Sequence, residues 1–235
     1  MNMIRRRLML AMAALTVVAG AVQRAPAGVT LVTSPTALAP NDSIDWGQLG
    51  PDSTSLPSST AVTSATGLVA TVSTADPTGL LRVDEGLSWI GNFTLGDHLI
   101  TNNQTSYFPL TIGFASPVSG AGAQIQLDNA GPFTATITAF SGTNSLGTFT
   151  ENGLSTALED GSAIFIGVLD TKAEITSIVF GISDPPSVSG DFAINSLLIN
   201  SVPEPSSLVL AAIAVPVGLG VWWRRRRRAA RTRAE

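Results

Sequence analysis

The stretch that decides the fold is 133-FTATITAF-140. Apolar residues take every second position and threonines take the positions between, with Phe133, Ala135, Ile137 and Ala139 set against Thr134, Thr136 and Thr138. A period of two with β-branched residues indicates a strand that buries one face. Residues 141–144 supply turn chemistry, so we expect residues 146–150 to return as the hairpin partner.

The rest of the body repeats this kind of pattern. Short β-prone runs separated by Gly, Asp or Pro occur at residues 67–74, 163–169, 175–182 and 192–199, and a first strand is expected within 28–40. Their spacing of roughly ten to fifteen residues is typical of an antiparallel β-sandwich. No stretch of the body has a clear helical period. We therefore predict an all-β domain over residues 28–201.

The N-terminus predicts an export signal. Residues 1–7 carry three arginines, residues 8–22 are apolar or small, and Ala25-Pro26-Ala27 forms a small-residue cleavage pattern. This order is typical of a secretory signal peptide. We expect the export translocon and signal peptidase to act on residues 1–27, with cleavage between Ala27 and Gly28. The alternative is an uncleaved anchor, for which about fifteen apolar residues are short.

The C-terminal end predicts one membrane span. Residues 206–223 carry no charge, and as a helix they would measure about 27 Å, close to the hydrocarbon thickness of a bilayer. Two tryptophans end this run, and a block of cations follows: Arg224, Arg225, Arg226, Arg227 and Arg228. The positive-inside rule places the tail 224–235 in the cytoplasm, and the signal peptide places the body on the other side.

A short motif precedes the predicted span. Pro203 and Pro205 flank Glu204, and prolines fit neither a helix interior nor a central strand, so we expect an extended, exposed segment. The motif, the apolar helix and the Arg-rich end together resemble the PEP-CTERM sorting signal of Gram-negative bacteria over residues 202–235. The resemblance implies that Pro203, Glu204 and Pro205 are recognised by an exosortase, an integral membrane cysteine protease. The protein would then reach the cell surface or the medium, often together with exopolysaccharide.

The body carries a second resemblance. Residues 44–50 (IDWGQLG), 120–126 (GAGAQIQ) and 191–195 (DFAIN) are similar to a recurrent body domain of PEP-CTERM proteins. The last of these segments is similar to the closing strand of many jelly-roll modules. This resemblance implies a jelly-roll-like sandwich and no particular activity.

Charge excludes one class of partner. Between Gly28 and Pro205 the chain has two cations, Arg82 and Lys172, against 16 acidic residues, which gives a net charge near −14. Such a surface repels phosphates and anionic headgroups, so we expect no nucleic-acid partner. The chain contains no cysteine, and a domain of this size can bury a sufficient core without disulfides.

Catalytic and metal-binding residues are scarce. His98 is the single histidine, and no G-x-S-x-G elbow accompanies it, so we interpret it as a loop or strand-edge residue and predict no enzymatic activity. Asp84-Glu85 and Glu159-Asp160 are adjacent acid pairs, which we interpret as solvated turn residues rather than a glycosidase pair. Calcium is the one ion that an acidic exported sandwich favours, but no site can be assigned to it.

Two tryptophans are candidates for contacts with sugar rings. Trp46 and Trp89 are the only tryptophans of the body, and an exposed indole could stack on exopolysaccharide. The alternative is that they anchor the core. The sequence as a whole predicts an exported, non-enzymatic surface or matrix protein that passes through the inner membrane with its body outside. The alternatives are a carbohydrate-binding module, a permanently anchored single-pass protein and, third, an enzyme.

Overall fold

A computed structural model describes residues 28–102, 107–183 and 190–201. Within them the chain is all-β, as predicted. Among the described residues no helix is long and apolar enough to cross a membrane. The predicted signal peptide (1–27) and the predicted sorting signal (202–235) lie outside the described residues. The strands are β1 (Val29–Val32), β2 (Asp42–Ile44), β3 (Thr54–Leu56), β4 (Ser59–Thr63), β5 (Val69–Thr74), β6 (Leu80–Asp84), β7 (His98–Asn102), β8 (Leu110–Leu127), β9 (Gly131–Ser141), β10 (Asn144–Ser155), β11 (Ile164–Asp170), β12 (Ile175–Ser183), β13 (Phe192–Ile194) and β14 (Leu197–Ser201), with two short turns, α1 (Pro35–Leu38) and η1 (Trp46–Leu49).

The long strand β8 joins two layers. Its first part, up to Phe114, pairs with β12 on one side and β5 on the other. Its second part, from Val118, pairs with β11 on one side and with β14 and β13 on the other. The bend between the two parts contains Pro117. Proline has no backbone N–H to donate to a neighbouring strand, so it is tolerated where strand pairing is interrupted.

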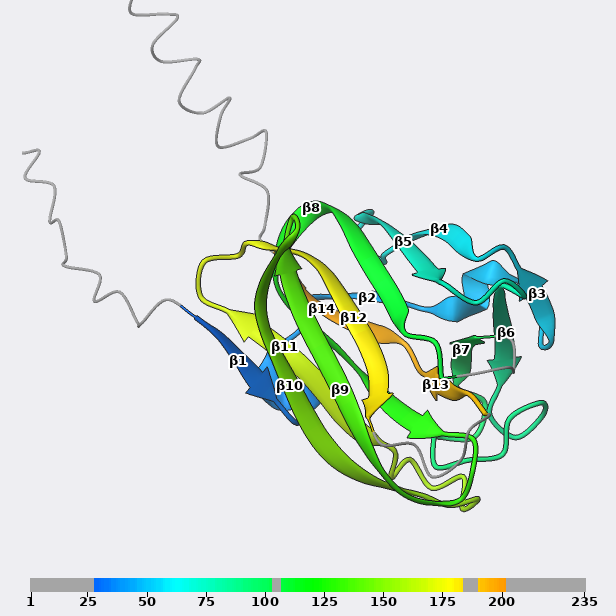
Figure 1. The fold of residues 1–235 in the computed structure, drawn as a ribbon. Helices are drawn as coiled ribbons and strands as arrows, with labels where there is room; N and C mark the ends of the chain where they lie inside the picture. Colours follow the sequence, from blue (N-terminus) through cyan, green and yellow to red (C-terminus); the bar gives the residue numbers. More distant parts are fainter. Residues whose placement is uncertain (1–27, 103–106, 184–189, 202–235) are drawn as a thin grey trace, which may run out of the picture.

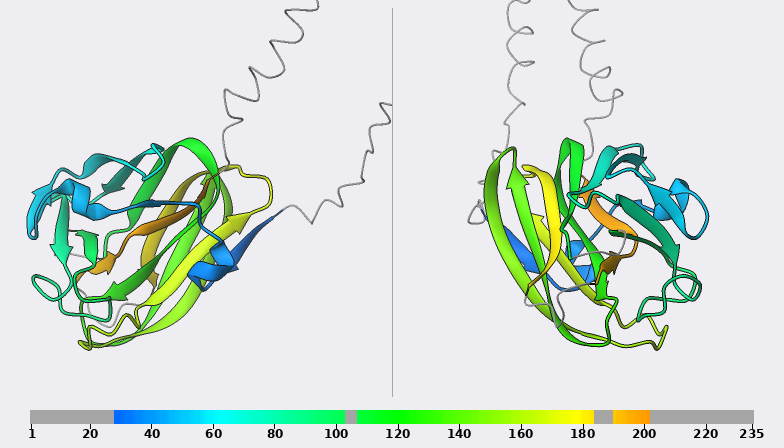
Figure 2. Two further views of the ribbon diagram at one scale, coloured as in Figure 1. Left: turned by 180° about the vertical axis from the view of Figure 1, so that it is seen from behind. Right: turned by 45° about the vertical axis from the view of Figure 1, so that its right-hand side comes forward.

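The layers follow from these pairings (Figure 1). One runs β4-β5-β8-β12-β9-β10, and the other contains β1, β11, the second part of β8, β14 and β2, with β13, β7, β6 and β3 continuing it. Every pairing between the named strands is antiparallel. Strands β9 and β10 lie against β11 of the other layer (Figure 2, right). The arrangement is consistent with a β-sandwich.

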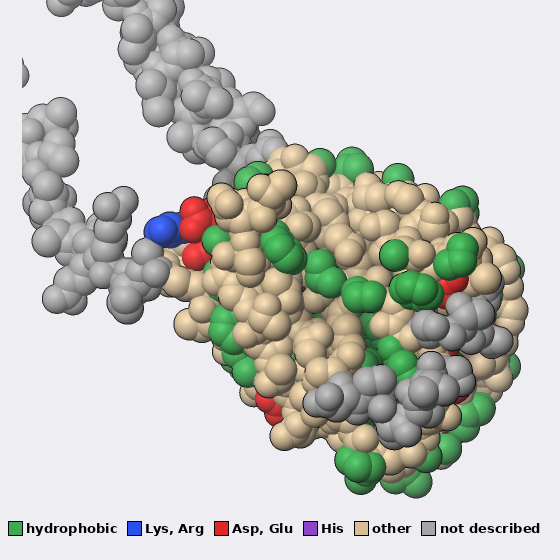
Figure 3. Space-filling model, viewed as in Figure 1, with side chains coloured by type: hydrophobic (Ala, Val, Ile, Leu, Met, Phe, Trp, Pro, Cys, Tyr) green, Lys and Arg blue, Asp and Glu red, His purple; other side chains and the backbone are tan. Residues whose placement is uncertain are grey.

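The alternation in β9 is confirmed. Its four apolar residues from Phe133 to Ala139 are buried between the layers, and its three threonines face outward. Burying a large aliphatic side chain such as Ile137 stabilises the fold by about 1.5–3 kcal/mol, so this period fixes which face is inside. On the outer face, few charged side chains lie over β9, β10 and β12 (Figure 3).

Two predicted elements differ from the structure. The hairpin partner of β9 is longer than residues 146–150, since β10 covers twelve residues. The expected strand 192–199 is interrupted at residue 195, because the side chain of Asn195 replaces its own backbone carbonyl as the acceptor for Gln124 N. Its amide donates to Gln124 Oε1 at 2.7 Å and its Oδ1 accepts from Gln124 N at 3.0 Å. The chain then resumes as β14 beside β2.

Both ends of the described body lie on the same side of the molecule (Figure 2, left). One is the start of β1 and the other is the end of β14. The loop between β6 and β7 lies at the opposite end. A body held through either terminus would therefore present this loop away from its attachment.

Candidate functional site: the groove beside the chain exit

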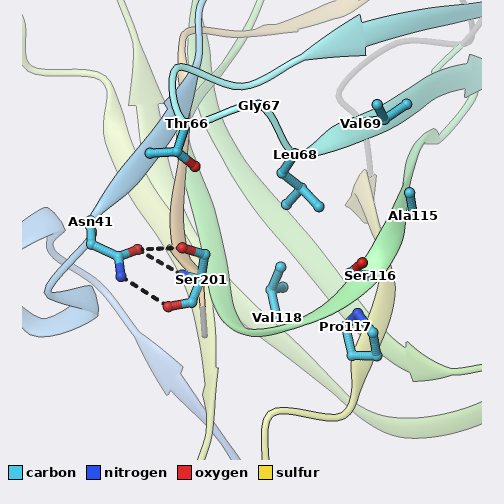
Figure 4. Close-up of a pocket in the computed structure, with 10 residues that line it drawn as sticks. All are labelled: Asn41, Thr66, Gly67, Leu68, Val69, Ala115, Ser116, Pro117, Val118 and Ser201. Carbon is cyan, nitrogen blue, oxygen red and sulfur yellow. Dashed lines mark hydrogen bonds between the residues drawn. The ribbon is translucent and has the colours of Figure 1, made fainter. Parts of the chain in front are cut away.

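The last described residue of the body is fixed by one asparagine (Figure 4). Asn41 Nδ2 donates to Ser201 O at 2.9 Å, and Asn41 Oδ1 accepts from Ser201 N at 2.8 Å and from Ser201 Oγ at 2.9 Å. The backbone N–H of Asn41 also donates to Ile199 O at 3.0 Å. The asparagine thus acts as a strand partner for the end of β14. Sequence reasoning missed this contact, because 160 positions separate the two residues and no local pattern connects them.

A groove opens beside this contact. It has a volume of about 650 Å³ and lies between the turn that joins β4 to β5 and the bend of β8. We call it the exit groove. Val69 is half exposed on one wall, and Leu68 and Val118 point toward one another across it (Figure 4). None of its residues is charged: Asn41, Thr66, Gly67, Leu68, Val69, Ala115, Ser116, Pro117, Val118 and Ser201.

One buried carboxylate holds the β4–β5 wall in place. Asp42 accepts hydrogen bonds from Ser64 Oγ at 2.5 Å and from Thr66 Oγ1 at 2.6 Å. It also accepts from the backbone N–H groups of Thr66 and Ser43 at 2.9 and 2.8 Å. Burial by itself raises the pKa of Asp42, but these hydrogen bonds outweigh it, so the pKa lies below its ordinary value. The turn is therefore tied to β2, the strand that pairs with β14.

His98 is held by acids and not by a hydroxyl. His98 Nδ1 lies 2.7 Å from Asp45 Oδ1, and Nε2 lies 3.9 Å from Asp84 Oδ1. Gly47 lies so close that a Cβ there would be 2.4 Å from Nδ1. Burial raises the pKa of Asp45, but hydrogen bonds from Gly47 N–H and His98, and the nearby charges of His98 and Arg82, lower it overall. The imidazole thus connects η1 to the start of β7, and none of the hydrogen bonds described for it involves a serine.

The acid pair at residues 84–85 does not consist of two solvated residues. Asp84 pairs with Arg82 at 2.6 Å, and Glu85 is only 1% exposed. Glu85 Oε1 accepts from Gly91 N at 2.6 Å, while Oε2 is buried and has no hydrogen-bond partner among the described residues. Burial raises the pKa of Glu85 to about 7, with the N–H of Gly91 opposing and repulsion from Glu159 and Asp97 adding to the rise. The turn-acid prediction is therefore wrong for Glu85.

The prediction of sugar stacking is wrong for Trp46. This indole has no exposed surface, and its Nε1 donates to Asn195 O at 2.8 Å, so it anchors η1 to the core. A sugar ring can stack only on an indole face that solvent reaches. Trp89 is 5% exposed and lines a cavity of about 230 Å³ together with Ser88, Thr101, Asp128 and Asp191.

The cavity beside Trp89 contains a carboxyl group with an altered pKa. Asp191 Oδ2 accepts from Thr101 Oγ1 at 2.8 Å. Burial raises the pKa of Asp191 to about 6, opposed by the hydroxyl of Thr101 and increased by the nearby Asp128. Within the described residues no group of three or more acids or histidines is arranged to hold a metal ion, so calcium stays a prediction without a site.

Most of the sequence-predicted site residues lie outside the described ranges. They are Ala25, Ala27, Pro203, Glu204, Pro205 and the block Arg224 to Arg228. Gly28 is described and is exposed just before β1. The structure therefore describes the surface from which residue 202 continues, and not the motif itself.

Comparison with known proteins identifies no family. No family model matches the chain, and no curated protein matches it. Among solved structures, the chain is similar to TmCBM61 in complex with β-1,4-galactotriose, with 13% sequence identity and a TM-score of 0.27. The similarity covers 57% of this chain and 88% of the other. At this level it carries no argument about function.

Proposed function

We propose that this chain is an exported, non-enzymatic protein of the cell envelope whose C-terminal segment 202–235 is a sorting signal. In this proposal the export translocon and signal peptidase act on residues 1–27, and residues 206–223 hold the protein in the inner membrane with its body outside. An exosortase-type protease then recognises Pro203, Glu204 and Pro205. The mature body serves a structural or binding role at the surface or in the extracellular polymer layer, with no cofactor.

The fixed exit of the chain is the observation that supports this proposal best. Asn41 binds Ser201 through three hydrogen bonds, and Pro203 follows only two residues later. Two residues reach at most about 7 Å, so the motif begins within that distance of a folded surface. A protease that reads a short sequence benefits from a substrate segment held in one place outside a rigid domain.

The mass of the C-terminal peptide tests the proposal. We would recover the protein from the surface or medium of its native host and expect the chain to stop near residues 203–206. A variant that combines Pro203→Ala with Glu204→Ala should stay in the inner membrane with Arg224 to Arg228 attached, whereas Asp160→Ala, a control at an exposed acid outside the groove, should be processed normally. Wild-type protein that is found only in the inner membrane with its arginines attached would show a permanent anchor instead.

The cavity beside Trp89 favours a second candidate, a carbohydrate-binding role for exopolysaccharide. An apolar indole with carboxylates and hydroxyls around it is the kind of lining that places a small polar ligand. We expect Asp128→Asn and Asp191→Asn to weaken retention of the protein on exopolysaccharide from its host. Asp160→Asn, a change outside this cavity, should not. Equal retention of all three variants would exclude this cavity as the site.

A further inference from the structure

We propose that the exit groove is a docking surface for the membrane-embedded protease that processes residues 202–235. This inference rests on the proposed function and extends it, since it assigns part of the recognition to the folded body. The occupant would be an apolar side chain on an extracytoplasmic loop of that protease.

The short connection between Ser201 and the motif brings a protease that binds the motif close to the folded body. Pro203 and Pro205 lie two and four residues after Ser201, so they can be at most about 7 and 14 Å from it. Ser201 itself lines the groove. A membrane protease is much larger than these distances, so an enzyme that grips the motif must approach the body surface around Ser201. The exit groove is a hollow on that surface.

The chemistry of the groove suits a protein contact. The body carries a net charge near −14, yet none of the ten lining residues is charged. Val69 is 50% exposed, and Ala115 and Pro117 are also exposed. An apolar side chain that enters here removes these surfaces from water without desolvating a charge.

The walls of the groove are held before any partner arrives. Asp42 ties the β4–β5 turn to β2 through Ser64 and Thr66. The opposite wall is the bend of β8, whose flanking residues Phe114 and Val118 pair with neighbouring strands. A preformed groove costs little ordering on binding, which favours recognition by a weak, transient contact.

The experiment measures the rate of processing in the native host by pulse–chase. Val69→Asp places a charge in the groove at an exposed position, and Leu87→Asp places the same charge at an exposed leucine of the β6–β7 loop, at the far end of the molecule. We expect Val69→Asp to slow processing by about fivefold or more, as loss of an apolar contact does, and Leu87→Asp to leave the rate unchanged. Thermal unfolding of both variants checks that each is folded.

A spacer separates docking from other effects of the substitution. Insertion of a flexible Gly/Ser segment between Ser201 and Val202 uncouples the groove from the motif, because a long linker lowers the effective concentration of the second contact. In the spacer chain we expect Val69→Asp to have little further effect. Equal processing of the Val69→Asp variant and the wild type, or equal slowing by Val69→Asp with and without the spacer, would overturn the docking proposal.

Failure of the proposed function gives a different result. If Pro203→Ala with Glu204→Ala is processed like the wild type, the motif is not the signal and the proposed function fails. If that double variant is blocked while Val69→Asp is processed at the wild-type rate, the sorting signal stands and only the docking surface is excluded.

Discussion

Asp42 holds the β4–β5 turn in place through hydrogen bonds. Its carboxylate accepts four hydrogen bonds from Ser43, Ser64 and Thr66, and it is 7% exposed. Asp42→Ala would leave the buried hydroxyl of Ser64 and the partly buried donors of Ser43 and Thr66 without this acceptor. We expect a loss of about 2–3 kcal/mol in the free energy of unfolding, measured by urea denaturation. Asp160→Ala is the control, because this exposed carboxylate bonds only to the neighbouring Ser162, and we expect it to change stability much less than Asp42→Ala.

The raised pKa of Glu85 should make the stability of the protein depend on pH. Its pKa is raised by burial from 4.5 to about 7, so the folded state holds a proton that the unfolded state has released between these values. This contribution is fully present below pH 4.5 and is lost as pH rises through about 7. Glu85→Gln removes the titrating group but keeps an acceptor for Gly91 N–H.

The measurement for Glu85 is the urea midpoint between pH 4.5 and 8. We expect the difference in stability between the wild type and Glu85→Gln to change in favour of the variant as pH rises, most steeply between pH 4.5 and about 7. Asp160→Asn serves as the control, because its pKa is lowered by the Ser162 hydroxyl and N–H, so it is already ionised throughout this range. A pH-independent difference between wild type and Glu85→Gln would contradict the prediction.

At the scale of elements, β9 provides a test of which strand face is buried. Ile137 is fully buried between the layers, while its neighbour Thr136 faces outward. Ile137→Ala removes three methyl or methylene groups from the core and should cost about 2–4 kcal/mol of unfolding free energy. Thr136→Ala should change it by less than about 0.5 kcal/mol. Both are measured as shifts of the urea midpoint at unchanged slope, and a larger loss for Thr136→Ala would reverse the assigned faces.

The strand β9 and the bend of β8 differ in how far the sequence predicts them. The alternation of apolar and polar residues predicts β9 directly, because the polarity of each side chain indicates whether it faces the core or solvent. The bend of β8 carries no such signal, since residues 115–123 are small apart from Pro117 and Val118, and their burial depends on strands far along the chain. The Asn41–Ser201 contact and the burial of Glu85 are likewise set by packing between distant segments. Local patterns therefore predicted the fold class, while the candidate site depends on tertiary contacts.

At the scale of the whole molecule, the positions of the two chain ends determine how a membrane-held body is oriented. Both ends of the described body lie on one side, and the β6–β7 loop lies at the other (Figure 2). If residues 206–223 hold the unprocessed protein in the membrane, the short connection from Ser201 keeps the exit groove close to it. The loop containing Leu87 would then face away from the bilayer and meet other molecules first.

Cysteine labelling can measure this orientation, because the natural chain has no cysteine that would interfere. We would introduce Val69→Cys or Leu87→Cys, at side chains that are 50% and 68% exposed, and react intact spheroplasts with a bulky maleimide. In the membrane-held precursor, Val69→Cys should label several-fold more slowly than Leu87→Cys, because the bilayer and the protease shield the groove. In the released protein the two rates should become similar, which controls for intrinsic reactivity. Equal rates in the precursor would mean that the body tumbles freely on its tether, and a docking surface at the exit groove would then have no fixed partner.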